Sequence, residues 1–354
     1  WVTEITDLNG NSAIYGYNDV GLLTSVDLPD PWLDTKITWS QVENTPITRV
    51  AQRCKIVDDN CDGTIYSTST SEFDALYRIT SSHEQDKVNT LHQYRSFEFD
   101  AHNNQTFVSY PFSTEAETTE GIHNTYDDLQ RLITTSQDGG GTVTTTYKAG
   151  NKVSVQDAGK NHEDGTNEQH TTTTTYLAYG SPSFNQATNI VSPEVTTAIA
   201  INQFGNIDSI TQTSTGGTYA NSLTEIRKYD SQENLCLISR SDVGITIYNN
   251  NDLGEVQWQA QGQSASSTCD TAVSASDKVT ISYDNLGAQR TISYGDSTPN
   301  RIFGLDNNGN IKSISGEGYN QSYNYNALGL LKDETLNITG RDGSLTVKYG
   351  YDGL

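Results

Sequence analysis

Residues 58–63 (DDNCDG) have the clearest metal-ligand spacing in the chain. Asp58, Asn60 and Asp62, followed by Gly63, match the first half of a calcium loop, in which alternating oxygen ligands and a sharp glycine turn wrap a hard cation. Ser69 stands where a bidentate Glu should close such a site, and we predict no helices on either side. We therefore favour a disulfide-pinned turn. Calcium is the only cofactor that the sequence suggests, and we predict neither a metal nor a cofactor.

Other catalytic and metal-binding patterns are weaker. Only His162 and His170, which have acidic residues between them, form a His cluster that could hold a metal, and a solvated loop is the better interpretation. We find no nucleophile elbow, zinc-protease motif or phosphate loop. Acidic pairs carry no weight in so acidic a chain, because two catalytic carboxylates need a defined separation across a cleft. We therefore predict no catalytic residue and no enzymatic activity.

Aromatic residues could serve a different chemistry, because their faces stack on sugars. The Tyr residues that open the repeated phrases described below recur with a turn, which indicates packing between neighbouring hairpins. Trp32, Trp39 and Trp258 fall outside that pattern. They are the residues that we would test first for contact with a carbohydrate.

The four cysteines are Cys54, Cys61, Cys236 and Cys269. An even number in an acidic, Thr-rich chain suggests two disulfides in an oxidising compartment. The sequence does not decide among the three possible pairings, and four reduced thiols are the alternative. We favour Cys54 with Cys61 and Cys236 with Cys269.

The elements that must position these residues can be predicted from a repeated sequence phrase. In this phrase an aromatic residue is followed by Asn or Asp, a Gly stands three places after that Asn or Asp, and a strand-like run comes next. Clear copies begin at Tyr17 (with Gly21), Phe73-Asp74, Tyr126-Asp127, Tyr283-Asp284 (with Gly287) and Tyr325 (with Gly329), and a last copy begins at Tyr351-Asp352. Weaker copies begin at Phe99, Ile201, Tyr229-Asp230, Asn250 and Leu305, and residues 7–11 form a partial one. Most intervals are between about 20 and 33 residues, the range of repeat architectures.

Each copy predicts a strand, a turn and a second strand. Asn, Asp and Gly tolerate positive φ, and an Asx side chain can bond nearby backbone. Residues 142–147, 171–176 and 278–283 alternate and are rich in β-branched and aromatic residues, as strands are. A single hairpin is marginal alone, so such units bury surface by stacking side by side. We expect an all-β ribbon of stacked antiparallel hairpins with almost no helix.

Composition agrees with a folded β protein and excludes some partners. Apolar residues make up 33% and charged residues 18%, and the formal net charge is −23. Nucleic acids and anionic membranes are bound through Lys and Arg, so neither is an expected partner. No apolar run is long enough for a membrane span. We read 1–354 as one continuous array, incomplete at both ends, with a loop-elaborated segment at 28–66.

The repeated phrases resemble the Tyr-Asp repeats of the Rhs family, which are shared with the C components of insecticidal toxin complexes, bacterial wall-associated proteins and teneurins. The positions of the Cys pairs are similar to the proteobacterial branch. The resemblance implies a curved β-ribbon that forms part of a hollow shell, usually around a C-terminal toxin. The self-cleaving aspartyl-protease region that follows the repeats in that family is not recognisable in these residues.

Three functions follow, in order of preference. The first is a structural segment of a secreted shell that encloses a C-terminal toxin or effector of the same polypeptide, as in competition between bacteria. The second is an extracellular or cell-surface module for adhesion or for binding a cell-surface glycan. The third is a polysaccharide-active enzyme, which the absence of a recognisable site makes the weakest.

Overall fold

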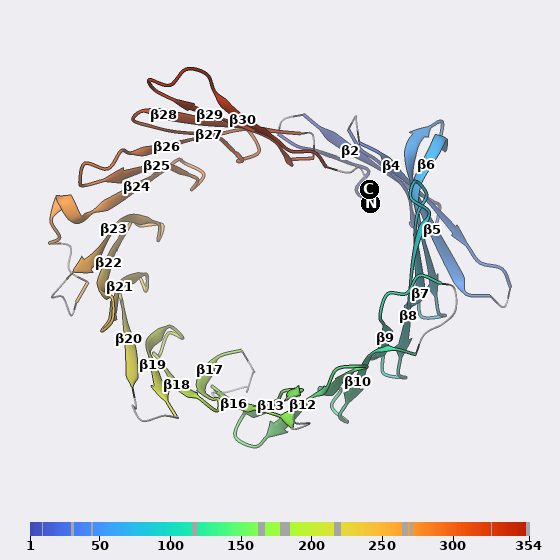
Figure 1. Ribbon diagram of the computed structural model, residues 1–354, viewed down its shortest axis with the longest axis horizontal. Helices are drawn as coiled ribbons and strands as arrows, with labels where there is room; N and C mark the ends of the chain where they lie inside the picture. The colour runs from blue at the N-terminus through green and yellow to red at the C-terminus, as the bar shows by residue number, and fades with distance from the viewer. Residues whose placement is uncertain are drawn as a thin grey trace. The chain divides into compact units, whose positions relative to one another are not determined.

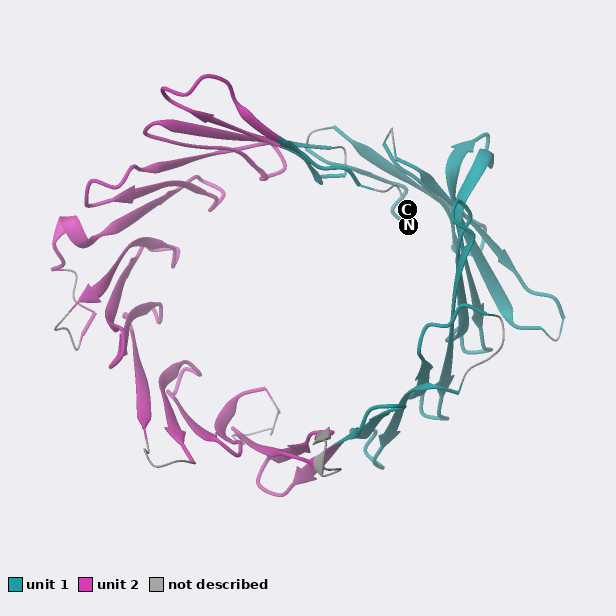
Figure 2. Cartoon of the chain, viewed as in Figure 1, with its two compact units in different colours: residues 1–143, 324–333, 347–354 teal, residues 144–323, 334–346 magenta. Residues whose placement is uncertain are grey.

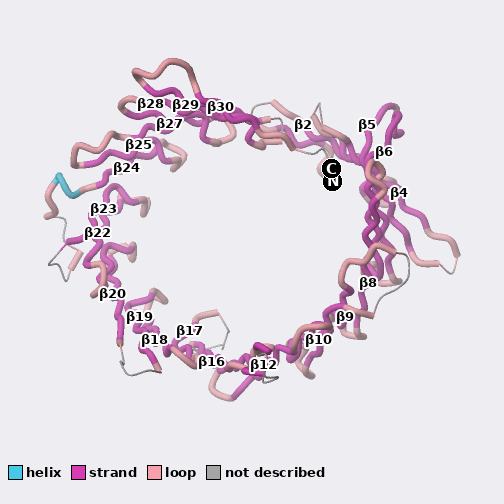
Figure 3. Tube along the Cα trace, viewed as in Figure 1, coloured by secondary structure: helices cyan, strands magenta, loops and turns pink. Residues whose placement is uncertain are grey.

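The computed structural model describes residues 1–8, 10–29, 32–43, 45–114, 119–161, 167–177, 185–215, 221–263, 268–269, 272–326 and 328–351 (Figure 1). Nearly all regular structure is β-strand, with one short 3₁₀ turn, Ala275–Asp277, before β24 (Figure 3). Twenty-eight strands belong to one antiparallel sheet, and β14 and β15 form a separate pair. The expected all-β antiparallel fold is therefore confirmed. Among the described residues, no helix has the length and apolar character needed to span a membrane.

The first fifteen strands are β1 (Glu4–Thr6), β2 (Ser12–Tyr17), β3 (Leu23–Asp27), β4 (Asp34–Ser40), β5 (Ile47–Val57), β6 (Asn60–Phe73), β7 (Ile79–Asp86), β8 (Leu91–Phe99), β9 (Gln105–Ser109), β10 (Gly121–Tyr126), β11 (Leu132–Gln137), β12 (Thr142–Lys148), β13 (Lys152–Gln156), β14 (Lys160–Asn161) and β15 (Asn167–Glu168).

The remaining strands are β16 (Thr171–Tyr176), β17 (Ala187–Val191), β18 (Val195–Ile201), β19 (Ile207–Ser214), β20 (Ser222–Tyr229), β21 (Leu235–Arg240), β22 (Gly244–Asn250), β23 (Val256–Gln263), β24 (Val279–Tyr283), β25 (Gln289–Tyr294), β26 (Arg301–Leu305), β27 (Ile311–Gly316), β28 (Tyr319–Tyr325), β29 (Leu331–Ile338) and β30 (Leu345–Lys348).

The chain divides into two compact units (Figure 2). Unit 1 comprises residues 1–143, 324–333 and 347–354, and unit 2 comprises residues 144–323 and 334–346. In unit 1, antiparallel pairing follows the chain from β1 to β11. In unit 2 it runs from β13 to β16 and then in chain order to β28. Each unit, taken by itself, is a single curved layer of strands (Figure 2).

The elaborated segment at 28–66 contains β4, β5 and the first part of β6. β5 has 11 residues and β6 has 14, whereas most strands elsewhere have five to eight. Their register runs from Ile47 opposite Phe73 to Val57 opposite Asn60, with an irregularity between Arg53 and Lys55. The β5–β6 hairpin therefore extends past β4, whose pairing with β5 stops at Cys54.

Little of the molecule is a hydrophobic core. The main buried cluster joins Cys236, Leu237 and Ile247, against which Trp258 and Cys269 pack. The chain exposes 22290 Å², whereas a compact protein of 38.8 kDa would expose roughly 14,000 Å². A single layer of strands has two outer faces, so most of its stability must come from backbone pairing and cross-strand side-chain contacts.

Candidate functional site

The repeated phrase folds into one particular turn, shown clearly by the turn at Asp127. The Asp127 N–H donates to the Arg131 carbonyl at 2.9 Å, and the Gln130 N–H donates to the Asp127 carbonyl at 2.9 Å. The Asp127 Oδ1 atom accepts from the N–H groups of Leu129 at 3.0 Å and Arg131 at 2.9 Å. Gln130 has a φ of 63°. One carboxylate oxygen thus closes a five-residue loop of the kind in which a left-handed residue makes a bulge.

The same hydrogen-bond pattern occurs in ten turns of the described chain, including the turn at Asp127. In each, the Oδ1 atom of the Asx residue accepts from the N–H groups two and four places on, and the residue three places on has positive φ. The ten Asx residues are Asn18, Asp74, Asp100, Asp127, Asn202, Asp230, Asn251, Asp284, Asp306 and Asn326. These are the ten phrases identified in the sequence, and Asp352 lies outside the described residues.

The left-handed position explains why glycine is frequent there but not required. Six of the ten turns have Gly at that position, among them Gly287 and Gly309, with φ of 78° and 85°. The other four carry Tyr77, Asn103, Gln130 and Glu233, with φ between 60° and 72°. Side chains with a Cβ pay a conformational cost in this region, so the Asx hydrogen bonds must offset it in those four turns.

The tyrosine that opens a phrase connects its turn to the previous repeat. The hydroxyl of Tyr126 donates to the carbonyl of Gln105 at 2.8 Å, and that of Tyr229 to the carbonyl of Ile207 at 2.8 Å. In both cases the acceptor follows directly after the preceding five-residue turn. The sequence indicated packing between hairpins but gave no sign of this bond.

Three further tyrosines make the same kind of bond. They are Tyr17 to the Val2 carbonyl at 3.0 Å, Tyr283 to the Val256 carbonyl at 3.1 Å and Tyr351 to the Leu331 carbonyl at 2.7 Å. We call these five contacts the tyrosine links. Each joins positions 15 to 27 residues apart in the chain. The links of Tyr126, Tyr229, Tyr283 and Tyr351 hold one hairpin against the preceding one, and that of Tyr17 holds β2 against the residues that lead into β1.

Electrostatics favours the donor and acceptor states that the links and turns use. Burial, with a smaller contribution from the Asp100 carboxylate, raises the pKa of Tyr126, and burial with Glu255 nearby does the same for Tyr283. Their hydroxyls therefore remain protonated donors. The side-chain hydrogen bond from Arg131 and the backbone N–H bonds lower the pKa of Asp127, which keeps the carboxylate ionised and accepting.

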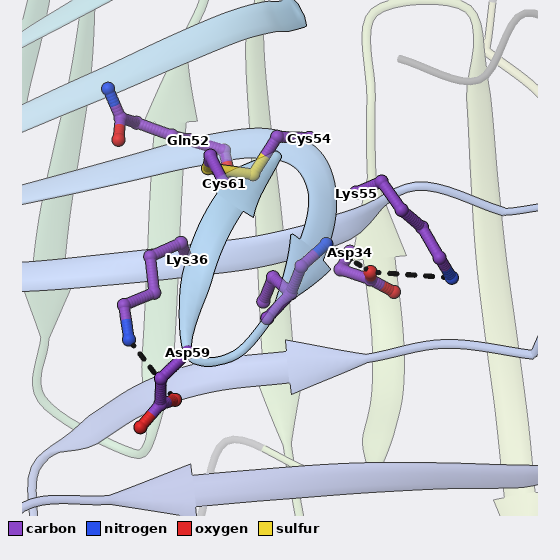
Figure 4. The surroundings of a disulfide bond; sticks show 8 residues. Asp34, Lys36, Gln52, Cys54, Lys55, Asp59 and Cys61 are labelled. Carbon is purple, nitrogen blue, oxygen red and sulfur yellow. Dashed lines mark hydrogen bonds and ion pairs between the residues drawn. A yellow bond between two sulfur atoms is a disulfide. The ribbon is translucent and has the colours of Figure 1, made fainter. Parts of the chain in front are cut away.

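Residues 58–63 form the tip of the β5–β6 hairpin. Asp58 and Asp59 have φ of 46° and 67°, as a two-residue hairpin turn requires. The Cys54–Cys61 disulfide crosses the hairpin just behind the tip, and Lys36 Nζ lies 3.4 Å from Asp59 Oδ1 (Figure 4). The structure thus places these residues in the disulfide-pinned turn that we favoured.

The structure describes all three residues of the calcium hypothesis, Asp58, Asn60 and Asp62, but only one of the two histidines of the other metal hypothesis. The side chain of Asn60 donates to the Asp58 carbonyl at 3.0 Å. His170 lies 3.5 Å from Asp157 and 3.4 Å from Glu168, while His162 falls outside the described residues. Within the described chain, no group of three or more His, Cys, Asp and Glu side chains is placed to hold a metal ion. Calcium binding at Asp58, Asn60 and Asp62 stays an untested hypothesis.

Asp34, which the sequence analysis did not single out, anchors the same segment. Its side chain is 0% exposed, and it accepts from the N–H groups of Leu28 at 3.0 Å and Ile56 at 2.8 Å. Lys55 Nζ lies 3.6 Å from the same carboxylate (Figure 4). This buried acceptor fixes the chain entering β4 against the end of β5.

Trp39 and Trp258 have defined packing partners in the structure. Trp39 donates its Nε1–H to the Leu23 carbonyl at 2.9 Å and lies 5.7 Å from the Phe73 ring. Trp258 packs on the buried cluster beside the Cys236–Cys269 disulfide, with Lys278 Nζ 4.0 Å from its ring centre. The Trp32 Nε1 atom is buried without a hydrogen-bond partner. Trp32 and Trp39 belong to unit 1 and Trp258 to unit 2.

Comparison with known proteins gives matches only at the level of structure. No protein-family model matches the chain, and no curated protein matches it by sequence. A chain in the crystal structure of TcdB2-TccC3-TEV aligns with a TM-score of 0.54 at 11% identity, covering 94% of this chain and 18% of that one.

Two further solved structures align less well. A chain of TcdB2-TccC3-Cdc42 has a TM-score of 0.46 at 12% identity, covering 98% of this chain and 21% of that one. A chain of the Photorhabdus luminescens Tc holotoxin pore has a TM-score of 0.45 at 10% identity, covering 96% and 22%. This chain thus spans about a fifth of the length of these structures. The alignment with the TcdB2-TccC3-TEV chain, at a TM-score of 0.54, shows a shared fold.

Proposed function

We propose that this chain is a structural segment of the wall of a secreted shell that encloses an effector domain of the same polypeptide, and that it carries no catalytic site. The observation that carries the proposal is the repeated turn with its tyrosine link. A wall must be continuous from repeat to repeat, and bonds such as those of Tyr126, Tyr229 and Tyr283 join a hairpin to the one before it within its own unit.

The surfaces of the strands also suit a wall. Polar side chains pair across neighbouring strands on their half-buried faces, for example Ser154 with Thr173 at 2.7 Å and Thr211 with Thr224 at 3.1 Å. Such Ser and Thr pairs stabilise a sheet without giving it an apolar surface. An enclosed protein would meet a hydrated lining of this kind, on which it could not dock tightly.

Two further observations support secretion and a shell of this class. Both disulfides of the favoured pairing, Cys54–Cys61 and Cys236–Cys269, are present, and such bonds persist in oxidising compartments. The structural neighbour with a TM-score of 0.54 is a toxin-complex protein. That neighbour's fold makes a shell role the natural proposal, and the enclosed effector is our inference.

The two alternative functions lack an observation in their favour. The hypothesis of a glycan-binding role depended on Trp32, Trp39 and Trp258. The Trp39 indole donates to the carbonyl of Leu23, and Lys278 lies over the Trp258 ring. A polysaccharide-active enzyme would need two carboxylates across a cleft. We therefore carry neither forward.

Protection of the effector tests the proposal. The full-length protein that contains this array would be treated with proteinase K under native conditions, and fragments would be followed by mass spectrometry. The effector should survive until the array is cut or denatured. The same effector produced alone, as the control, should be digested rapidly. Equal digestion rates for the enclosed and the separate effector would refute the containment role.

A further inference from the structure

One edge of the sheet in unit 2 is formed by five successive repeat turns. They are the turns at Asn202, Asp230, Asn251, Asp284 and Asp306. Antiparallel pairing is continuous from β18 to β27, so every second connection falls on the same side of the sheet. The first two turns also touch, because the Asn206 side chain donates to the Glu233 carboxylate at 2.9 Å. We call these five turns the turn edge of unit 2.

Three of these turns hold a large apolar side chain in solvent. Phe204, Leu253 and Leu286 each stand two places after the Asx residue, and they are 63%, 83% and 94% exposed. Their N–H groups donate to the Asx Oδ1 atom at 2.9, 3.0 and 2.9 Å, so the turn fixes the backbone that carries each side chain. The turn does not need an apolar residue there, since Gln232 and Asn308 occupy the same place in the other two. Exposed apolar side chains that recur at one position indicate a contact surface.

The turn edge of unit 2 is also acidic. Its five-residue loops contain six carboxylates and neither Lys nor Arg. The carboxylates belong to Asp230, Glu233, Asp252, Glu255, Asp284 and Asp306. A second copy of the chain carries the same net charge of −23 and is repelled, as is an anionic lipid surface. Charge complementarity therefore selects a cationic partner.

The edge is hollowed beside its aromatic residue. A cavity of about 470 Å³ is lined by residues of the turns at Asn202 and Asp230, among them Phe204 and Glu233, and by Asp208 and Lys228. The two carboxylates outnumber the one ammonium group. A Lys or Arg side chain of a partner would find there both an aromatic face and an opposite charge.

The spacing of the turns matches the repeat of an α-helix. Neighbouring strands stand about 4.8 Å apart, so successive turns of the edge are about 9.6 Å apart. One heptad of an α-helix rises about 10.5 Å. Side chains on one face of an extended strand are about 6.8 Å apart and do not match.

We propose that the turn edge of unit 2 binds a cationic amphipathic helix of a partner protein. One apolar side chain per heptad packs against Phe204, Leu253 or Leu286, and Lys or Arg side chains beside it meet the carboxylates. The interaction does not depend on the containment role, because it needs only the edge of the sheet.

A synthetic helical peptide of four heptads tests this directly. Each heptad has one Leu flanked by two Lys, with Ala elsewhere, and a control peptide has the same composition with the Leu residues moved to different faces. Fluorescence anisotropy of each labelled peptide is followed as the 354-residue chain is added at physiological ionic strength. We expect saturable binding of the ordered peptide at least tenfold tighter than that of the control. Equal affinities, which would show attraction by charge alone, or no binding of either peptide would overturn the proposal.

Matched variants locate the contact. The double variant Leu253→Ser with Leu286→Ser should bind the ordered peptide at least tenfold more weakly. Val243→Ser is the control, because Val243 is 63% exposed but lies between β21 and β22, at the opposite edge of the same unit. It should bind like the wild type. Unchanged affinity in the double variant would contradict the proposed surface.

Two measurements on the wild-type chain do not depend on how the variants fold. The ordered peptide should shift the NMR signals of the Phe204, Leu253 and Leu286 amides and leave that of Val243 in place. Sedimentation of the chain alone should show no self-association that the double variant abolishes. Such self-association would make a second copy the occupant of this edge and would overturn the proposal, as would shifts confined to other residues.

Discussion

The segment from Leu28 to Phe73 and the regular repeats keep the same β-ribbon together by different means. The segment uses a few strong contacts: one buried carboxylate at Asp34 and one disulfide, Cys54–Cys61. The repeats use many weak contacts: an Asx turn in each of the ten described copies, and in four copies a tyrosine link to the preceding hairpin. The difference teaches that a single-layer sheet can be stabilised either by a local anchor or by a contact that repeats. Only the second can be extended indefinitely.

The largest effect should come from the anchor. Asp34→Ala leaves the buried N–H groups of Leu28 and Ile56 without an acceptor, so we expect a loss of about 3 kcal/mol in the stability of the β4–β6 region. Asp34→Asn, the matched control, keeps one oxygen acceptor and should lose less. Hydrogen exchange of the Leu28 and Ile56 amides measures both. If the Leu28 and Ile56 amides still exchanged slowly in Asp34→Ala, Asp34 would not be the anchor of this segment.

The disulfide of the same segment should rank second. Cys54 and Cys61 are seven positions apart, and the chain-entropy model gives about 2.5 kcal/mol for so short a loop. The double variant Cys54→Ser with Cys61→Ser should lower the denaturation midpoint of the β5–β6 hairpin and leave the repeats of unit 2 unchanged. An equal loss in both regions would show that they are not independent.

Removing one tyrosine link should cost less. Tyr126→Phe keeps the ring but leaves the Gln105 carbonyl without its donor, so we expect a loss of about 1 kcal/mol. Equilibrium denaturation monitored at unit 1 measures it. Phe73→Tyr is the contrasting variant, since it changes the same phrase position without removing a bond. A neutral Tyr126→Phe would show that ring packing alone joins the hairpins.

Smaller effects of opposite sign should follow at the left-handed turn position. A Cβ at Gly309 would meet no atom within 4 Å, so Gly309→Ala isolates the cost of its φ of 85°. We expect a loss of about 1 kcal/mol there and a gain of about 0.5–1 kcal/mol for Tyr77→Gly, where φ is 60° and the side chain is 59% exposed. Thermal denaturation compares the two, and the same sign for both would contradict the proposed turn geometry.

The smallest effect should separate Asp turns from Asn turns by pH. Hydrogen bonds, the first from the Asn104 side chain, lower the pKa of Asp100, and those from Arg131 lower that of Asp127. A lowered folded pKa means stability that is present above the unfolded value of about 3.9 and is lost as the pH falls through the folded value. The turn at Asn202, residues 202–206, contains no carboxylate.

Amide chemical shifts followed by NMR would show this difference. On acidification below about pH 4, the Leu129 amide of the Asp127 turn should shift, while the Phe204 amide of the Asn202 turn should not. Simultaneous change in both would indicate global unfolding in place of local titration.

The sequence predicted the features that are local to one hairpin. The Asx and Gly positions, such as Asp284 with Gly287, could be predicted because turn chemistry lies within five residues. The even count of cysteines suggested two disulfides, and of the three pairings that the sequence left open the structure has the favoured one, Cys54–Cys61 and Cys236–Cys269.

The features that join distant residues could not be predicted. A tyrosine link ends on a backbone carbonyl that any residue can supply, here Gln105, Ile207 or Val256. The contact between His83 and His92 depends on the register of β7 against β8, which no spacing in the sequence reveals. The burial of Asp34 likewise depends on how far the long hairpin extends past β4.

Native-state hydrogen exchange of Tyr229→Phe against the wild type tests the central claim that the links couple one repeat to the next. The Tyr229 hydroxyl joins its own turn at Asp230 to the residue that follows the turn at Asn202. We predict faster exchange in both of these turns and no change in the distant turn at Asp306. Faster exchange at Asp230 alone, or no change at either turn, would contradict the account.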